Sequence, residues 1–574
     1  METSAKKNAD PQPFWVKSYP KNVPPSIDEK IEKYSSVLDV FEEACERFPT
    51  RPAFTNFGHT ITYSELNRKA EIFAAYLQNE LKLKKGDRIA IQMPNLLQYP
   101  VVMYGALKAG LVIVNTNPLY TEREMKHQFN DAGVTAIVIV ANFARQLQNI
   151  LNETSIRHVI ITEIGDLLPF PKNYLVNTVV KYVKKMVPPY SIPDAIPFKT
   201  VMEKGAAMTY HKVSMSLDEI AFLQYTGGTT GVSKGAMLTH RNMVANMLQV
   251  YEWMKVRLIE GEEIGVCALP LYHIFALTVH GMALVAFGAH NILITNPKEL
   301  KTFVKDIRKY KFTVTTGVNT LFNALLNYPE FAKLDFSSLK VSVAGGMALQ
   351  SAVAQRWREV TKSLLIEGYG LTEASPVVCA NPIDGTDRVG TIGLPLPSTL
   401  VKLVDDSGNE AKSGEPGELC VKGPQVMKGY WQRPDETSKI LTEDGWLKTG
   451  DIAVFDADGF VKIVDRKKDM ILVSGFNVYP NEVEDAIATH PGVLEVAAIG
   501  VPSERSGEVV KVFVVKKDPA LTEQDVIEHA RKTLTNYKVP KFVEFRTELP
   551  KTNVGKILRR ALKEEEAAKA QNKQ

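Results

Sequence analysis

Alternating strand and helix patterns are the feature of this sequence that most limits its fold. Between Ser36 and Val140, segments with apolar residues at helical spacing alternate with short apolar segments rich in Val and Ile. Repeated strand–helix–strand units place parallel strands side by side, with helices on both faces of the sheet. We therefore predict an α/β fold whose large N-terminal domain contains parallel-rich sheets.

The patterns in this first region give ranges that a structure can test. Helices are assigned where apolar residues recur every three or four positions, and strands where short apolar runs end in turn residues. The expected helices cover 37–47, 64–81, 99–109 and 122–132, and the expected strands cover 53–63 (two short strands around a turn), 88–93, 111–116 and 134–140.

The length of the chain predicts more than one domain, because 574 residues exceed what one hydrophobic core usually organises. Five consecutive charged residues, 465–469, follow the strand-like segment 460–464 and suit a hinge. We predict a large N-terminal domain over residues 1–465, which includes a small β-barrel-like subdomain. A small α+β C-terminal domain over 466–574 is predicted to follow the hinge.

The predicted C-terminal domain has a pattern of its own. Thr522 and Asp525 have the spacing of a capping box at the start of a helix. The expected helices cover 481–489 and 523–534, and the expected strands cover 493–501 and 509–516.

Composition and charge exclude several classes of protein. The formal net charge of +4, without a block of Lys and Arg, predicts no nucleic-acid partner. The four cysteines are far apart in the sequence, which favours a reducing compartment without disulfides or a zinc cluster. No segment has the apolar core of a secretory signal or the length of a spanning helix. A cytoplasmic location is expected.

A proline-rich interruption at 167–199 contains a basic amphipathic segment, 174–186. Such a helix most often packs on its own domain, and this is the first expectation. Contact with an anionic membrane surface, here the inner face of the cell membrane, is the alternative. The apolar residues at helical spacing are Leu175, Val179, Tyr182, Val183 and Met186, and the lysines among them are Lys181, Lys184 and Lys185.

A dense glycine- and threonine-rich segment follows the predicted strand 220–223. Residues 225–235 read Tyr-Thr-Gly-Gly-Thr-Thr-Gly-Val-Ser-Lys-Gly, which is not the Walker pattern. Glycines let backbone amides approach an anion, hydroxyl groups add donors, and a lysine adds a mobile positive charge. We predict a polyphosphate-binding loop; a flexible surface loop is the alternative. The expected contributors are Thr226, Gly227, Gly228, Thr229, Thr230, Gly231, Ser233 and Lys234.

The segment 367–373, Glu-Gly-Tyr-Gly-Leu-Thr-Glu, has side chains suited to a nucleotide. Glycines on both sides of Tyr369 leave its ring free to lie against a flat base, and Thr372 and Glu373 add oxygen donors. One carboxylate, together with a triphosphate and water, suffices to hold Mg²⁺, which prefers oxygen ligands. Taken alone, the segment could equally be a turn.

Three other segments supply a histidine, a carboxylate with an arginine, and a lysine. His273 lies in an apolar segment, where a histidine is usually a core residue with one hydrogen bond. Asp451 can accept hydrogen bonds from both ribose hydroxyls, and Arg466 can add a charge-assisted contact. Lys556 follows a glycine in a basic segment, where a lysine is ordinarily a surface residue.

The loop at 225–235 resembles the signature loop of the adenylate-forming enzymes: acyl-CoA synthetases, luciferases and the adenylation domains of peptide synthetases. Val232 stands where many members carry proline, a departure that affects loop stiffness more than chemistry. Four more segments match the family in the same order, and together they span nearly the whole chain. They are 269–275, 367–373, 446–470 and 550–560.

Within this family the sequence looks most similar to the bacterial long-chain fatty-acid–CoA ligases, and 444–470 resembles the fatty-acyl-CoA synthetase signature. The resemblance implies that ATP, with Mg²⁺, converts a long-chain fatty acid to an acyl-adenylate and pyrophosphate. Coenzyme A then takes up the acyl group, after the C-terminal domain has rotated about the hinge. Related long-chain enzymes form dimers, so a homodimer is also expected.

The resemblance also implies roles for individual residues. Tyr369 stacks on adenine, Thr372 contacts the phosphate region, and Glu373 with Thr226 holds Mg²⁺. His273 borders the acyl carboxylate. The matching lysine, Lys556, bridges carboxylate and α-phosphate, Lys468 occupies the hinge position, and further contacts to nucleotide or coenzyme A come from Gly345, Gly346, Gly368, Asp451, Arg466 and Gly475.

Other functions stay open. The acid could be medium-chain or aromatic, and the acceptor could be a carrier protein, although no carrier domain follows Lys556. A nucleotide-binding sensor or scaffold without catalysis is the non-enzymatic alternative. The presence together of Lys234, Glu373, Asp451, Arg466 and Lys556 argues against it.

Overall fold

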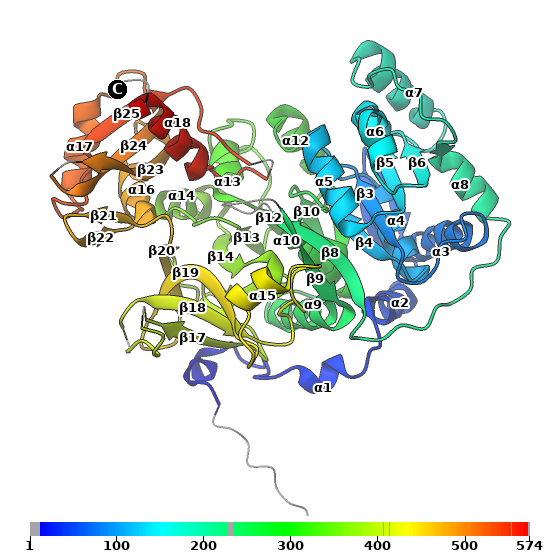
Figure 1. The fold of residues 1–574 in the computed structure, drawn as a ribbon, viewed down its shortest axis with the longest axis horizontal. Coiled ribbons are helices and arrows are strands. Elements are labelled where there is room, and N and C mark those ends of the chain that lie inside the picture. Colours follow the sequence, from blue (N-terminus) through cyan, green and yellow to red (C-terminus); the bar gives the residue numbers. More distant parts are fainter. Residues whose placement is uncertain are drawn as a thin grey trace, which may run out of the picture.

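The structure is a computed structural model, which describes residues 12–226, 233–405, 407–412, 414–503, 505–552 and 554–571. These residues form four sheets of seven, nine, four and five strands, with helices packed around the first two (Figure 1). The predicted α/β class is confirmed. None of the helices among these residues is both long and apolar enough to cross a membrane.

The seven-stranded sheet carries the segment around the predicted phosphate loop. Its strands are parallel, except that the last two pair in antiparallel fashion with Thr226 opposite Lys234. The predicted loop therefore connects the two strands of a hairpin. The order is β7 (Ile196–Pro197), β6 (His158–Thr162), β5 (Ala136–Val140), β3 (Arg88–Gln92), β4 (Val112–Asn115), β8 (Ile220–Thr226) and β9 (Lys234–Thr239).

The nine-stranded sheet carries the segments with His273 and Tyr369 nearby. Its six central strands are parallel, and antiparallel strands complete both edges. The order is β16 (Leu394–Pro395), β15 (Val377–Ala380), β14 (Leu364–Gly370), β13 (Val341–Gly345), β12 (Val314–Gly317), β10 (Ile264–Cys267), β11 (His290–Leu293), β1 (Pro52–Asn56) and β2 (His59–Thr62).

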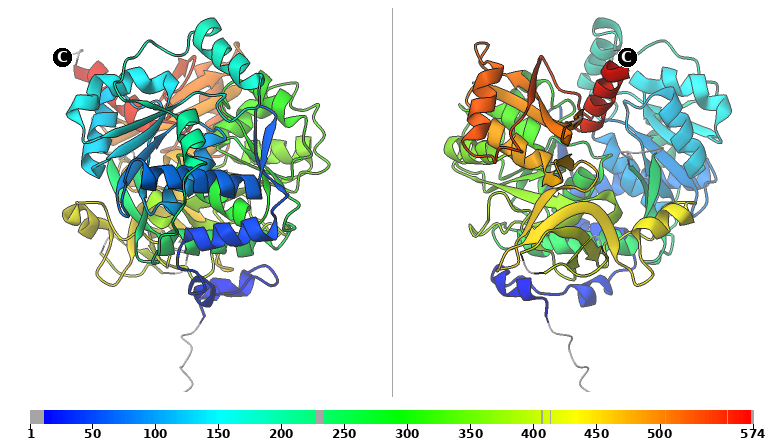
Figure 2. Two further views of the ribbon diagram at one scale, coloured as in Figure 1. Left: turned by 90° about the vertical axis from the view of Figure 1, so that its right-hand side faces the viewer. Right: turned by 60° about the vertical axis from the view of Figure 1, so that its left-hand side comes forward.

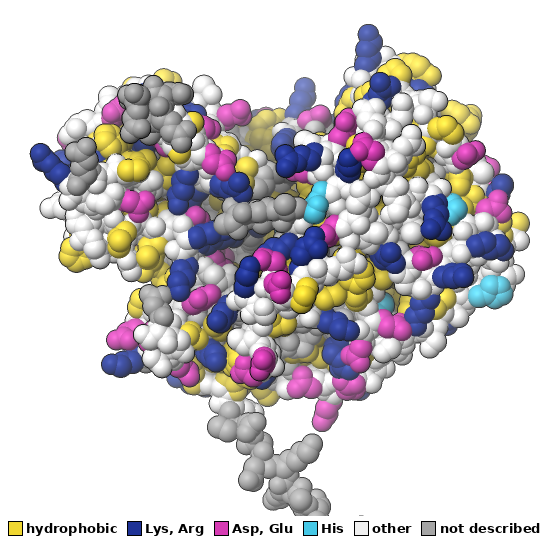
Figure 3. Space-filling view, in the orientation of Figure 1, with side chains coloured by type: hydrophobic (Ala, Val, Ile, Leu, Met, Phe, Trp, Pro, Cys, Tyr) yellow, Lys and Arg dark blue, Asp and Glu magenta, His cyan; other side chains and the backbone are white. Residues whose placement is uncertain are grey.

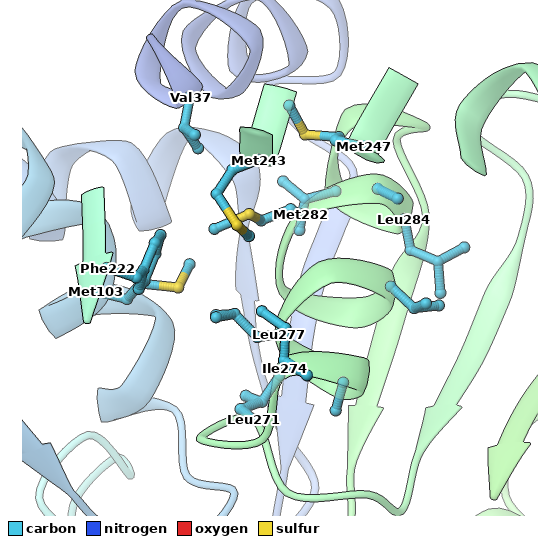
Figure 4. Close-up of a cluster of buried hydrophobic side chains, with 14 of the residues drawn as sticks. Val37, Met103, Phe222, Met243, Met247, Leu271, Ile274, Leu277, Met282 and Leu284 are labelled. Carbon is cyan, nitrogen blue, oxygen red and sulfur yellow. The ribbon is translucent and has the colours of Figure 1, made fainter. Parts of the chain in front are cut away.

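One hydrophobic core joins the two large sheets. Met103 of α4 (Gln98–Lys108) and Phe222 of β8 belong to the same buried cluster as Met243 of α9 (His240–Met254) and Leu277 of α10 (Ile274–Thr278) (Figure 4). Every residue of α4 is buried, so its lack of a polar face matches its position between layers. The two sheets are thus held in a fixed relation.

The predicted elements of the first region are confirmed to within two residues at each end. The helices are α2 (Val37–Arg47), α3 (Tyr63–Asn79), α4 and α5 (Glu122–Ala132). Ser36 and Asp39 form a capping box at α2, and Thr121 and Glu124 form another at α5.

The third sheet is a small antiparallel one, which pairs β17 (Leu400–Val404), β18 (Gly417–Lys422), β19 (Leu447–Phe455) and β20 (Val461–Arg466). The fourth sheet contains β21 (Ile471–Val473), β22 (Phe476–Val478), β23 (Val493–Ser503), β24 (Gly507–Lys516) and β25 (Phe542–Arg546). Its helices are α16 (Pro480–Ala488), α17 (Glu523–Arg531) and α18 (Arg559–Gln571).

The fourth sheet with its helices forms a separate body beside the rest, which we call the C-terminal unit (residues 466–571) (Figures 1 and 2). Its predicted helices and strands are confirmed to within three residues, as is the Thr522–Asp525 capping box. The division into domains at residue 465 stays a prediction, although the sheet changes between Arg466 and Ile471.

The expectation that segment 174–186 packs its apolar side on its own domain is wrong. The segment forms α7 (Lys172–Thr178) and the π-helical turn η4 (Val179–Val183) at the periphery of the molecule (Figure 1). Its one buried side chain is polar: Asn177 accepts a hydrogen bond from the Gly165 N–H. All five apolar residues named in the sequence pattern are exposed.

Candidate active site

An apolar cavity lies against one face of the nine-stranded sheet. Its walls include Thr316 and Val343 on β12 and β13, Ile366 on β14, and Val250 and Trp253 on α9. The polar groups that reach it include His273, Tyr369, Thr372 and Lys556. Residues that are far apart in the sequence thus converge on one space.

Lys556 enters this cavity from the C-terminal unit. A Cβ atom added to Gly346 would lie 2.8 Å from Lys556 Cε, and Gly346 has a positive φ of 81°. Both facts require glycine at this position. The neighbouring Gly555 carbonyl accepts a 2.9 Å hydrogen bond from Thr320 Oγ1, which fixes the loop that carries the lysine.

The environment of Lys556 lowers the pKa of its amine. Burial, and to a lesser extent the charge of Arg466, lowers the pKa of Lys556 to about 8, while Asp451 and Glu373 act in the opposite direction. The group can therefore exchange a proton near neutral pH when no anion is bound.

Tyr369, Asp451 and Arg466 form a connected group beside the cavity. The Tyr369 hydroxyl donates to Asp451 Oδ2, and Arg466 Nε lies 3.5 Å from Asp451 Oδ1. Asp451 and Arg466 are direct partners across β19 and β20. Burial raises the pKa of Asp451, against the charge of Arg466 and the hydrogen bond from Tyr369. Asp451 could therefore accept hydrogen bonds from ribose hydroxyls in place of the one from Tyr369.

Glu373 and Lys234 are both held by the segment that follows β18. Glu373 Oε1 accepts a 2.6 Å hydrogen bond from the Tyr430 hydroxyl. Lys234 Nζ lies 2.7 Å from Glu436 Oε2, and hydrogen bonds from Lys234 and Lys439 lower the pKa of Glu436 to about 2. The carboxylate of Glu436 is therefore paired with the lysine that is predicted to bind a phosphate.

His273 caps the short helix α10 and faces the cavity. Its Nδ1 accepts from the Phe275 backbone N–H, so this nitrogen carries no proton. Burial, together with the charge of Lys556, lowers the pKa of His273 to about 3. The imidazole is therefore neutral, and the positive charge beside it is that of Lys556.

Most of the predicted site residues that the structure describes come together here. Gly345, Gly346 and Gly368 line the cavity with Tyr369 and Thr372. Gly475 does not, and instead turns the chain between β21 and β22 with a φ of 84°. Of the predicted loop, Thr226, Ser233 and Lys234 are described and lie at the two ends of its hairpin, whereas Gly227, Gly228, Thr229, Thr230 and Gly231 lie outside the described residues.

The sequence did not single out Tyr430 or Glu436. Tyr430 follows a glycine, Gly429, just as Tyr369 follows Gly368. Gly429 has a positive φ of 139°. The signal in the sequence that could have found Tyr430 is an aromatic residue that follows a glycine. That signal does not predict the contact of Tyr430 with Glu373, because 57 positions separate the two residues.

The donor chemistry near Glu373 fits a magnesium ion that also binds phosphate. A single accessible carboxylate suffices when water and phosphate supply the remaining oxygens. No group of three or more His, Cys, Asp or Glu side chains in the described ranges could hold a metal alone.

Comparison with known proteins identifies the relatives of this chain. The AMP-binding enzyme model matches residues 41–431, and the AMP-binding enzyme C-terminal domain model matches 482–556. The chain is 57% identical to a long-chain-fatty-acid–CoA ligase from Escherichia coli and 58% identical to one from Salmonella typhi. Both matches cover 97% of this chain and 99% of the relative.

Solved structures share the fold. A crystal structure of an anthranilate CoA ligase in complex with anthranoyl-AMP has a TM-score of 0.83, and the match covers 94% of this chain and 98% of that one. At 23% sequence identity this likeness concerns the fold alone.

The low pKa of Lys556 gives a prediction that needs no assay of activity. An amine reacts with an acylating reagent only when neutral, so labelling of Lys556 should rise with a midpoint near pH 8, instead of near 10.5. Arg466→Gln removes a neighbouring positive charge and should move this midpoint to higher pH. Peptide mapping after brief labelling across a pH series measures it.

The matched control is Arg308→Gln, which removes an exposed arginine from another part of the molecule. It should leave the midpoint unchanged. A midpoint near 10.5 in the unmodified protein would contradict the burial of Lys556 described above.

Proposed function

Because this chain belongs to the family of AMP-binding enzymes, we propose that it is a long-chain fatty-acid–CoA ligase. It activates a fatty acid with ATP to an acyl-adenylate and pyrophosphate, and it transfers the acyl group to coenzyme A. The observation that carries the proposal is the meeting of Lys556 with an apolar cavity beside Tyr369 and Asp451.

The first half-reaction overcomes the low reactivity of a carboxylate. A carboxylate oxygen attacks the α-phosphorus of ATP, the bond to the β-phosphate oxygen breaks, and pyrophosphate leaves. Lys556 is our candidate for the group that holds the carboxylate and the α-phosphate together. When bound, Mg²⁺ would neutralise charge on the phosphates, and Glu373 with Thr226 would hold it.

Few groups of the site carry a charge that can stabilise the phosphates. His273 carries no charge and so orients without competing with Lys556 for the carboxylate. Lys234 would leave Glu436 for a phosphate, and Tyr369 would stack on the adenine. Such positioning and charge stabilisation account for most catalysis of phosphoryl-type transfers, and no protein nucleophile is needed.

The lining of the cavity supports a long acyl chain as the substrate. Its walls gather aliphatic and aromatic side chains from several elements, so a hydrocarbon chain would be removed from water along its length. Those on and around α9 and beyond β15 are Val250, Trp253, Met254, Leu258, Ile383 and Leu396.

In the second half-reaction the thiol of coenzyme A attacks the acyl carbon, and AMP leaves with the electrons of the broken bond. We place the hinge at Lys468 and the passage for coenzyme A beside Gly475. Both assignments rest on family resemblance. Transfer to a carrier protein, or use of a medium-chain or aromatic acid, is the alternative within the same chemistry.

Pyrophosphate release tests the proposed reaction and its substrate together. With ATP and Mg²⁺, the activity should be higher with palmitate than with octanoate or coumarate, and acyl-CoA should form only when coenzyme A is supplied. Lys556→Ala should lower pyrophosphate release by about 100-fold or more, as expected for the loss of a charge that acts in the transition state.

A preference for coumarate would keep the adenylation chemistry and overturn the fatty-acid assignment. Unchanged release in Lys556→Ala would exclude this lysine from the first half-reaction. Calorimetric titration with ATP shows whether the variant still binds the nucleotide, and so separates loss of catalysis from loss of the nucleotide site.

We also propose that the chain contacts the inner face of the membrane peripherally, through the surface formed by α7 and η4. Tyr182 and Val183 are 67% and 71% exposed, and Phe170 just before the helix is 80% exposed. Such a cluster is unusual on a protein surface and typical of an interaction site. Yellow and dark blue side chains meet in this region of Figure 3.

The charge beside these side chains selects an anionic bilayer as the partner. Lys181, Lys184 and Lys185 are exposed on the same segment. Lysines near an anionic surface each contribute on the order of 1 kcal/mol to binding, and inserted aromatic and aliphatic side chains add to this. Long-chain fatty acids partition into such a bilayer, so the contact would bring enzyme and substrate together.

Flotation with vesicles tests this surface. The protein should float with vesicles that contain phosphatidylglycerol and less with pure phosphatidylcholine. Changing Lys181, Lys184 and Lys185 to Glu should abolish flotation, because attraction becomes repulsion. The control changes three exposed lysines at and before α12 (Leu300–Ile307), Lys298, Lys301 and Lys305, to Glu. Equal flotation of both variants would contradict the proposed surface.

The family resemblance further supports a homodimer, which we propose without assigning an interface. Light scattering should then give a mass of twice 63.8 kDa for the chain in solution. A mass of 63.8 kDa at all concentrations would contradict it.

A further inference from the structure

A carboxylate of the C-terminal unit lies at the N-terminus of α14 (Ser351–Thr361). Asp485, on α16, accepts hydrogen bonds from the Ser351 backbone N–H (2.9 Å, to Oδ1) and the Ser351 hydroxyl (3.0 Å, to Oδ2). Gln350, which stands at the N-cap position, accepts a hydrogen bond from Asn319 with its side-chain oxygen. Asp485 therefore does for α14 what a capping side chain does for other helices.

The position of α14 connects this contact to the active site. The chain runs from β13 through Gly345 and Gly346, which line the cavity, and enters α14 five residues later. The N-terminus of a helix carries a partial positive charge that a carboxylate stabilises. The same docked position of the C-terminal unit thus places Asp485 on α14 and Lys556 against Gly346.

Two neighbouring contacts cross the same boundary. From α13 (Asn319–Leu326), Thr320 donates to the Gly555 carbonyl at 2.9 Å and Asn323 donates to the Leu494 carbonyl at 2.8 Å. In both, the acceptor is a neutral backbone carbonyl. Asp485 is the charged acceptor among these three contacts, and charge-assisted hydrogen bonds are the stronger kind.

Glu367, in the middle of β14, completes the surroundings of Asp485. Burial, and to a lesser extent the charge of Asp485, raises the pKa of Glu367 to about 8, against a hydrogen bond from the Leu349 backbone. Near neutral pH this carboxyl group is largely protonated. It therefore tolerates the approach of Asp485 without the repulsion between two carboxylates.

We propose that Asp485 is a positioning residue that caps α14 only while Lys556 lies in the cavity, and so favours the arrangement for adenylation over that for thioester formation. The inference rests on the proposed two-step function and on movement of the C-terminal unit between the steps. When the unit turns away, α14 loses its cap, which opposes the turn.

The magnitude follows from the cost of removing a cap. An N-cap substitution typically changes a helix equilibrium by about fivefold and at most by about 30-fold. If each half-reaction is proportional to the population of its own arrangement, the ratio of the two rates changes by the same factor. This holds whichever arrangement is more populated.

The experiment measures the two half-reactions separately in the full-length protein. Pyrophosphate release from ATP and palmitate without coenzyme A reports adenylation, and acyl-CoA formation from supplied palmitoyl-adenylate reports the second step. In Asp485→Ala, the ratio of the first rate to the second should fall by about 5-fold to 30-fold. Asp485→Asn keeps an accepting oxygen and should lie between this variant and the unmodified protein.

A control variant separates this role from a general loss of stability. Glu528→Ala removes an exposed carboxylate from α17, within the same C-terminal unit, and should leave the ratio unchanged. An unchanged ratio in Asp485→Ala, whether both rates persist or both fall equally, would overturn the proposal. Absence of adenylation in the unmodified protein would instead overturn the proposed function.

Discussion

The approach of Lys556 to the backbone of Gly346 is the contact on which the arrangement of the site depends. It unites a loop near the end of the chain with a turn that follows a central strand, β13, and it exists only because position 346 has no side chain. The hydrogen bonds of α13 and α14 to the C-terminal unit hold the docked position in which this contact is made. Burial, more than any neighbouring charge, lowers the pKa of the same amine.

Several groups proposed to face substrates already have a partner within the protein. Lys234 is paired with Glu436, Glu373 with Tyr430, and Asp451 with Tyr369. Removing a charge from water without giving it a partner is costly, and these partly buried groups are already paired before the nucleotide arrives. Binding then exchanges one set of hydrogen bonds for another. This requirement explains why tyrosines lie beside two of the three charged groups.

The sequence was sufficient for what depends on local pattern. Helices such as α2 and α5 were predicted because their apolar residues recur at helical spacing, and the structure adds a capping box at the start of each. The convergence of His273, Tyr369 and Lys556 was predicted by family resemblance, because no local rule brings them together. Contacts such as Glu436 with Lys234 and Asp485 with Ser351 were missed, since they join residues more than 130 positions apart. The exposure of Tyr182 and Val183 was missed for a related reason: an amphipathic pattern defines an apolar face but not what lies opposite it.

The boundary of the C-terminal unit is polar. Its buried hydrophobic clusters contain only residues from 471 onward, and the clusters of the remaining chain end at Val461. No apolar core among the described residues therefore spans the boundary. Polar contacts cross it: the hydrogen bonds of α13 and α14, and the ion pairs of Arg466 with Asp451 and of Arg559 with Asp465. Polar interfaces between domains permit relative motion, because water can replace the lost partners. The proposed withdrawal of Lys556 between the two steps would use such a boundary, and the proposed cap on α14 would give the unit a preferred position without making that position permanent.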